Sequence, residues 1–182
     1  EGDTVLVHGA GPIGLVIVDV AKRIGARVIV SEPSEIRRTA ALEFGADFVI
    51  NPLHEDLKSR VLALTDQAGP NTIFDAAGIP SLLQPSLELL ATAGTMVPMS
   101  FNPKLTEISC QPVNMKELTI AGTRHQRMMF PKVIHDLDNR MDMLQKYVTH
   151  TFPLEQYEEA FALFQDKESD ARKIVLTVKS GK

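Results

Sequence analysis

Three glycines at a fixed spacing form the stretch of the sequence best suited to chemistry. Gly9, Gly11 and Gly14 follow a short apolar run and enclose Pro12 and Ile13. In such a turn the first glycine allows a tight bend, the second lets the backbone approach a pyrophosphate, and the third lets a following helix pack against a sheet. The free amides and positive dipole at the N-terminus of that helix favour an anion. The spacing therefore predicts a cradle for the phosphates of a dinucleotide.

A carboxylate lies where the ribose of such a dinucleotide is expected. Glu32 follows a second apolar run, residues 27–31, and stands eighteen residues beyond Gly14. A carboxylate there accepts hydrogen bonds from both hydroxyls of the adenosine ribose and repels a 2′-phosphate. Two like charges about 4 Å apart repel by roughly 4 kcal/mol at an effective dielectric of about 20. The chain is therefore predicted to bind NAD rather than NADP, although the nearby Arg37 could offset part of this repulsion.

Alternating strands and helices surround these residues. Apolar residues after the glycine turn recur at helical spacing and predict a helix with one buried stripe, formed by Ile13, Val16, Ile17, Val20 and Ile24. The expected strands lie at residues 4–8, 27–31, 47–51, 72–76, 95–99 and 117–122. Strands that alternate with helices through short connections predict an α/β fold with a doubly wound, six-stranded parallel sheet of the Rossmann type. Ligands of such a sheet bind beyond the carboxyl ends of its strands.

Two breaks in this alternation are also expected. Pro85 falls inside a leucine-rich helical pattern, so it should kink that helix or mark its true start. Residues 101–114 are rich in proline and asparagine and are predicted to form a loop.

The alternation ends after residue 123. Residues 130–147 are predicted to form one helix, 149–152 an extended segment, 154–164 an amphipathic helix and 173–178 a last strand. This order has no strand–helix–strand logic of its own, so it predicts a C-terminal return segment whose strand pairs elsewhere. We accordingly expect an NAD-binding domain at residues 1–123 and a separate segment at residues 124–182.

Composition and charge exclude other classes of function. The 182 residues carry a formal net charge of −4, which argues against a nucleic-acid partner. No apolar run approaches membrane-spanning length and no secretory leader is recognisable, so we expect no membrane partner and a cytoplasmic location. A single cysteine, Cys110, and five scattered histidines give no metal-ligand spacing, so no metal site is expected within these residues.

Several motifs, in order, resemble those of a known family. They are Gly2-Asp3, residues 9–15, Phe-Gly-Ala-Asp at 44–47, Lys-Glu-Leu-Thr-Ile-Ala-Gly at 116–122 and Phe-Pro-Leu at 152–154. Together they resemble the coenzyme half of the zinc-dependent medium-chain alcohol and polyol dehydrogenases, in particular the sorbitol (iditol) and threonine dehydrogenases. The resemblance covers the whole chain. It implies hydride transfer from a polyol or secondary alcohol to NAD.

The resemblance also implies a set of cofactor-binding residues. It places the backbone around Ile13 on the pyrophosphate, Glu32 on the ribose and Arg37 beside the adenine. Segments 99–101 and 123–125 would flank the nicotinamide, with Lys173 or its neighbour Arg172 near the phosphates. The full set is Gly9, Gly11, Pro12, Ile13, Gly14, Glu32, Arg37, Met99, Ser100, Phe101, Thr123, Arg124, His125 and Lys173. No residue is assigned as catalytic, because His125 is equally consistent with an exposed loop histidine.

One departure from the family is large. Its members carry an N-terminal catalytic domain, similar to the chaperonin GroES fold, that supplies Cys, His and Glu ligands to a catalytic zinc. That domain does not occur in these residues, and the chain starts at Glu1 with its first strand expected from residue 4. We therefore expect a piece of a longer protein, which binds NAD without turnover and has zinc only in the parent enzyme.

The missing domain bears on the partners of this chain. Residues 124–182 would pack on that domain, which together with this chain would bind a small alcohol or polyol substrate. The resemblance further implies a homodimer built near the edge of strand six.

Two other functions remain open at this stage. One is a non-catalytic module that binds a dinucleotide. The other, which is less favoured, is a methyltransferase dependent on S-adenosylmethionine, because that fold also uses a glycine-rich first turn and an acid after strand two. The three glycines at 9, 11 and 14 and the Lys-Glu-Leu-Thr-Ile segment argue against the methyltransferase.

Overall fold

The computed structural model describes residues 2–99, 102–124, 128–138, 140–166 and 169–178. The chain divides into two compact units, Glu1–Arg124 and His125–Lys182. None of the helices in the described ranges is long and apolar enough to cross a membrane.

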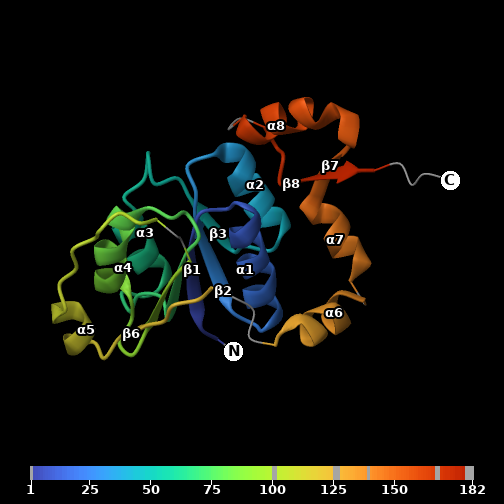
Figure 1. Cartoon of the computed structure of the whole chain (residues 1–182). Coiled ribbons are helices and arrows are strands. Elements are labelled where there is room, and N and C mark those ends of the chain that lie inside the picture. Colours follow the sequence, from blue (N-terminus) through green and yellow to red (C-terminus); the bar gives the residue numbers. More distant parts are fainter. Residues whose placement is uncertain (1, 100–101, 125–127, 139, 167–168, 179–182) are drawn as a thin grey trace. The chain divides into compact units, whose positions relative to one another are not determined.

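The first unit is built on a six-stranded, fully parallel sheet (Figure 1). Its strands are β1 (Thr4–His8), β2 (Arg27–Ser31), β3 (Phe48–Ile50), β4 (Thr72–Asp75), β5 (Thr95–Pro98) and β6 (Thr119–Ile120). The spatial order is β3-β2-β1-β4-β5-β6. The chain therefore moves outward from β1 first to one side and then to the other, which is the doubly wound order predicted from the sequence.

Helices cover both faces of this sheet. In the view of Figure 1, α1 (Pro12–Arg23) and α2 (Glu35–Glu43) lie on one side, and α3 (Leu57–Leu64) and α4 (Leu83–Leu89) on the other. The short helix η1 (Pro80–Leu82) precedes α4, and Pro85 stands in the first turn of α4, so it marks the start of the helix. One expectation was wrong: the predicted loop at residues 101–114 contains the start of helix α5 (Gln111–Met115). Five residues are too few to show a helical period, and Pro112 is tolerated there because it lies in the first turn.

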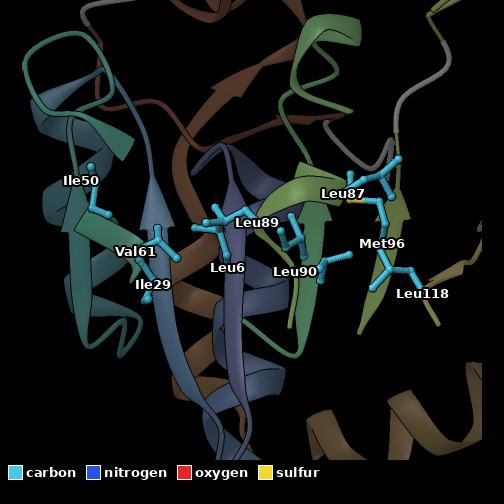
Figure 2. Close-up of a cluster of buried hydrophobic side chains, with 10 residues drawn as sticks. Leu6, Ile29, Ile50, Val61, Leu87, Leu89, Leu90, Met96 and Leu118 are labelled. Atoms are coloured by element: carbon cyan, nitrogen blue, oxygen red, sulfur yellow. The ribbon is translucent and has the colours of Figure 1, made fainter. Parts of the chain in front are cut away.

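The core on the α3 and α4 face is a cluster of aliphatic side chains (Figure 2). It contains Leu6, Ile29, Ile50, Val61, Ile73, Leu87, Leu89, Leu90, Met96 and Leu118. Because side chains alternate along a strand, Leu6, Ile29 and Ile73 face this cluster while their neighbours face the other layer. Strands covered on both faces need near-continuous apolar runs, and the sequence shows this for β1 and β2.

Helix α1 buries a different face from the one predicted. Its buried residues are Gly14, Leu15, Val18 and Ala21. Most of the predicted stripe is exposed instead: Ile13 by 54%, Val16 by 46%, Val20 by 42% and Ile24 by 68%. The helix is apolar on nearly every face, so helical spacing alone could not select the face that contacts the sheet. Close packing decided the face, because Gly14 and Ala21 let the helix approach the strands closely enough to bury Leu15 and Val18 as well.

In its described residues, the second unit combines three α-helices and the short helix η2 with two paired strands. Its elements are α6 (Phe130–Asp138), α7 (Met141–Tyr147), β7 (Val148–Pro153), η2 (Leu154–Gln156), α8 (Tyr157–Gln165) and β8 (Lys173–Thr177). Strands β7 and β8 pair in parallel, with α8 between them in the chain, so the expectation that the last strand pairs elsewhere was wrong. The single helix predicted for residues 130–147 is wrong, because α6 and α7 are separate helices. Asp138 is the last residue of α6, and an aspartate side chain competes with helical hydrogen bonds, which favours a break there.

Candidate functional site

The turn between β1 and α1 depends on a glycine at position 9. Gly9 has a φ of +90°, a conformation that residues with side chains rarely adopt. Its amide donates to the Ser31 carbonyl at the end of β2, at 2.8 Å. A Cβ at this position would lie 3.1 Å from the Ala77 amide nitrogen, in the loop that follows β4. The turn is thus held tightly between β2 and β4, at the point where the strand order reverses.

A side chain would meet different surroundings at positions 14 and 11. A Cβ at Gly14 would lie 2.0 Å from the Gly9 carbonyl oxygen, so no side chain fits between the helix and the turn. A Cβ at Gly11 would meet no atom within 4 Å. Gly11 is the N-cap of α1, Pro12 follows as the first helical residue, and no side-chain hydrogen bond from a described residue caps this end. The first amides of α1 therefore face an open space suited to an anion.

Glu32 is built into this turn. The side chain is buried, with only 5% of the residue exposed. Its Oε2 accepts a hydrogen bond from the Ala10 amide at 2.9 Å, and its Oε1 accepts one from the Ser34 amide at 2.9 Å. An ionised carboxylate has about four acceptor positions, so two remain for other donors. Glu32 thus lies beside the glycine turn, with capacity left to bind hydroxyl groups.

Two arginines follow Glu32 and lie in different surroundings. Arg37 is half-buried in the first turn of α2, and its amide points to the hydroxyl of the N-cap Ser34 at 3.5 Å. The side chain of Arg38 donates to the carbonyl oxygens of Glu32 and Pro33. Arg38 therefore fixes the loop after β2. The sequence could not single out Arg38, because adjacent residues of one type can be told apart only by their contacts, and the position of Arg37 beside the adenine stays a prediction.

The carboxyl ends of β4 and β5 complete this edge of the sheet. Asp75 ends β4, and its Oδ1 accepts hydrogen bonds from the Ala77 amide at 3.1 Å and the Gly78 amide at 3.0 Å. The Met99 amide, directly after β5, donates to the Asp75 carbonyl at 3.0 Å. Met99 is half-buried. The loops after β1, β4 and β5 are thereby joined along one edge, which is the ligand-binding edge of a parallel sheet.

His8, the last residue of β1, is a buried histidine that the sequence reading left without a role. It is 2% exposed, and its Nε2 lies 3.0 Å from the Ser86 hydroxyl. That hydroxyl donates to the Leu82 carbonyl at 2.7 Å, so Nε2 must carry the proton and act as donor. Nδ1 has no hydrogen-bond partner among the described residues. Burial lowers the pKa of His8 from 6.5 to about 4, although the nearby Asp75 charge opposes this shift, so the ring is neutral at pH 7.

The structure does not test the remaining predicted residues of the cofactor site. Thr123 and Arg124 lie after β6 and are exposed. Lys173 starts β8 in the second unit and is also exposed. Ser100, Phe101 and His125 lie outside the described residues. The roles assigned to these six positions stay predictions.

The described ranges hold no group of three or more His, Cys, Asp or Glu side chains that could bind a metal ion. Cys110 is an exposed free thiol at the start of α5.

Comparison with solved structures shows the same fold in known dehydrogenases. An alcohol dehydrogenase, RspB, from Escherichia coli CFT073, crystallised with NADH, superimposes with a TM-score of 0.88 at 36% identity; the match covers 97% of this chain and 52% of that one. A 2R,3R-butanediol dehydrogenase from Bacillus subtilis gives a TM-score of 0.88 at 29% identity, over 96% of this chain and 50% of that one.

The sequence comparisons agree with the structural ones. The starvation-sensing protein RspB of Escherichia coli K12 is 37% identical over 97% of this chain and 52% of its own length. An L-threonine 3-dehydrogenase of Pyrococcus horikoshii is 38% identical over 91% of this chain and 49% of its own. The chain thus spans about half the length of these curated relatives. The family described as zinc-binding dehydrogenase matches residues 12–139, and the chain belongs to this family.

Proposed function

We propose that this chain is the NAD-binding half of an oxidoreductase that moves a hydride between a nicotinamide coenzyme and an alcohol or polyol. The observation that carries the proposal is the open helix N-terminus at Gly11 directly beside the buried carboxylate of Glu32. Family membership and the NADH-bound relative support it.

The residues around the turn fit a dinucleotide. The space that a side chain at Gly11 would occupy can take a pyrophosphate, with the amides of Ile13 and Gly14 at the first turn of α1 as donors. The two unused acceptor positions of Glu32 suit the 2′- and 3′-hydroxyls of the adenosine ribose. A 2′-phosphate would face the same buried charge, which favours NAD over NADP.

The nicotinamide end would lie beyond β5 and β6. Bound NAD supplies the hydride acceptor. The residues of this chain would orient the ring from segments 99–101 and 123–125, that is Met99, Ser100, Phe101, Thr123, Arg124 and His125, whereas Lys173 would lie near the phosphates. We assign these residues to holding the coenzyme and give none of them a catalytic role.

The substrate class is proposed from the relatives. Their names specify L-threonine, scyllo-inosose and 2R,3R-butanediol, which are alcohols or derivatives of polyols. The part of such an enzyme that is not in this chain would supply the zinc ligands and most of the substrate pocket. We further propose that residues 124–182 pack on that part, that the coenzyme units dimerise near β6, and that the protein is cytoplasmic.

Calorimetric titration of the chain with NADH and NADPH tests the proposal. We expect NADH to bind in the micromolar range and NADPH much more weakly. Glu32→Ala should remove this preference, whereas Glu35→Ala, which removes an exposed acid at the start of α2, should keep it.

Three results would contradict the proposal in different ways. Failure of both nucleotides to bind would contradict the coenzyme site. Equal binding of NADPH by the unchanged chain would contradict the role of Glu32. Binding of S-adenosylmethionine without any binding of NADH would restore the methyltransferase alternative.

A further inference from the structure

We infer that Glu32 positions the pyrophosphate turn as well as receiving the ribose. The inference rests on the proposed coenzyme function and adds a second task for the same carboxylate. Oε2 accepts from the Ala10 amide and Oε1 from the Ser34 amide, both at 2.9 Å. One buried side chain therefore connects the turn after β1 with the loop after β2.

The backbone pattern explains why the turn needs this connection. Two consecutive amides of the turn donate to the end of β2: Gly9 to the Ser31 carbonyl at 2.8 Å, and Ala10 to the Glu32 carboxylate. The next residue, Gly11, caps α1 without a side-chain hydrogen bond. Glycines flank Ala10 on both sides, so neighbouring side chains cannot restrict its peptide planes. The carboxylate thus sets the orientation of the peptide between Gly9 and Ala10, which precedes the anion site at Gly11.

A nucleotide that lacks ribose hydroxyls distinguishes a Glu32 that only binds the ribose from a Glu32 that also positions the turn. If Glu32 binds only the ribose, removing its charge should leave the affinity for such a nucleotide unchanged, or raise it because one negative charge beside an anion is lost. If Glu32 also positions the turn, the affinity should fall, because the amides of α1 are no longer held in place. Glutamine can accept only through one oxygen, so it cannot bridge both amides.

Titration of the full chain with ADP and with 2′,3′-dideoxy-ADP separates these cases. For Glu32→Gln we expect the affinity for dideoxy-ADP to fall about tenfold, the size of one charge-assisted hydrogen bond. Glu35→Gln makes the same charge change three residues away on an exposed side chain, and it should leave that affinity unchanged. Glu32→Asp keeps the charge but is shorter, so it should restore the affinity only in part.

The results distinguish this inference from the proposed function. If the unchanged chain binds neither ADP nor NADH, the proposed function fails. If it binds ADP, and Glu32→Gln binds dideoxy-ADP as well as the unchanged chain does, only the positioning role fails.

Amide proton spectra give a readout that does not depend on how well the variants fold. In the unchanged chain the Ala10 amide should exchange slowly with solvent and resonate downfield, as expected for a buried bond to a carboxylate. A rapidly exchanging Ala10 amide in the chain without ligand would overturn the inference.

Discussion

At the scale of single residues, the three glycines of the turn have separable physical roles. Gly9 supplies a positive φ, Gly14 allows contact between helix and turn, and Gly11 leaves space open. Spacing in the sequence alone does not distinguish the roles of the three glycines. Their surroundings predict different consequences for substitution.

Gly14→Ala should destabilise the fold, whereas Gly11→Ala should mainly affect binding. The new Cβ at position 14 meets the Gly9 carbonyl oxygen at 2.0 Å, and overpacking of this kind costs about 1–3 kcal/mol or more. At position 11 it meets no atom within 4 Å, and the φ of −71° suits alanine, so the free energy of unfolding should change by less than about 1 kcal/mol. Thermal unfolding and NADH titration of both variants check this. Equal destabilisation by the two substitutions would contradict it.

The buried His8 should make stability fall as the pH is lowered. Its pKa is lowered from 6.5 to about 4 in the folded chain, so the folded state binds fewer protons than the unfolded state between these values. The contribution of His8 to the free energy of unfolding is fully present above pH 6.5. About 3 kcal/mol of it is lost as the pH falls toward 4. Urea unfolding at several pH values should show this slope. His8→Leu cannot titrate and should flatten it, whereas an unchanged slope in this variant would rule out His8 as its source.

At the scale of elements, an ion pair joins α1, β2 and β3 at the edge opposite to the candidate site. Lys22 Nζ lies 2.7 Å from an Asp47 carboxylate oxygen, and that oxygen also accepts from the Val28 amide at 2.7 Å. Desolvation alone would raise the pKa of Asp47, but the hydrogen bonds from Lys22 and Val28 outweigh it and lower that pKa. The side chain of Asp47 is 33% exposed, so the charge contribution is partly screened.

Asp47→Asn should therefore cost about 1 kcal/mol at neutral pH, mostly through weaker hydrogen bonds. The lowered pKa means that this contribution is present at neutral pH and is lost as the pH falls below the ordinary value of 3.8. Chemical unfolding of this variant and of Glu107→Gln, which removes an exposed acid in the loop after β5, measures the difference in the free energy of unfolding. Equal unfolding free energies at neutral pH would contradict the prediction.

The contact between α4 and the sheet is made by fully buried leucines. Leu87→Ala should cost about 2–5 kcal/mol, because it leaves a cavity in the cluster of Figure 2. Leu105→Ala, at a side chain 95% exposed, should change the free energy of unfolding by less than about 0.5 kcal/mol. Unfolding curves of the two variants test this layer of the fold, and a small effect at Leu87 would mean that α4 is not packed as described.

At the scale of the whole molecule, the chain corresponds to one part of the longer relatives that it matches. It spans 49–52% of the curated relatives named above. The zinc and most of the substrate pocket are proposed to belong to the part that this chain lacks. We therefore expect the chain to bind the coenzyme without turning over an alcohol substrate.

The purified chain is expected to bind NADH but to show no oxidation of polyols or secondary alcohols, and to contain no stoichiometric zinc. Elemental analysis and an assay of NADH formation test this directly. Turnover that withstands removal of metal by a chelator would show that these residues contain catalytic groups not yet identified.

The sequence by itself determined the parallel sheet, the position of the glycine turn and the acid beside it. Local patterns suffice for these features: β1 and β2 are continuous apolar runs, and the glycines and Glu32 stand at fixed offsets from them. Only the tertiary structure decided which face of α1 is buried and which partners Glu32, Arg38 and His8 bind. The physical reason is that periodicity reports how apolar a face is, whereas burial and hydrogen bonding depend on contacts between residues far apart in the chain.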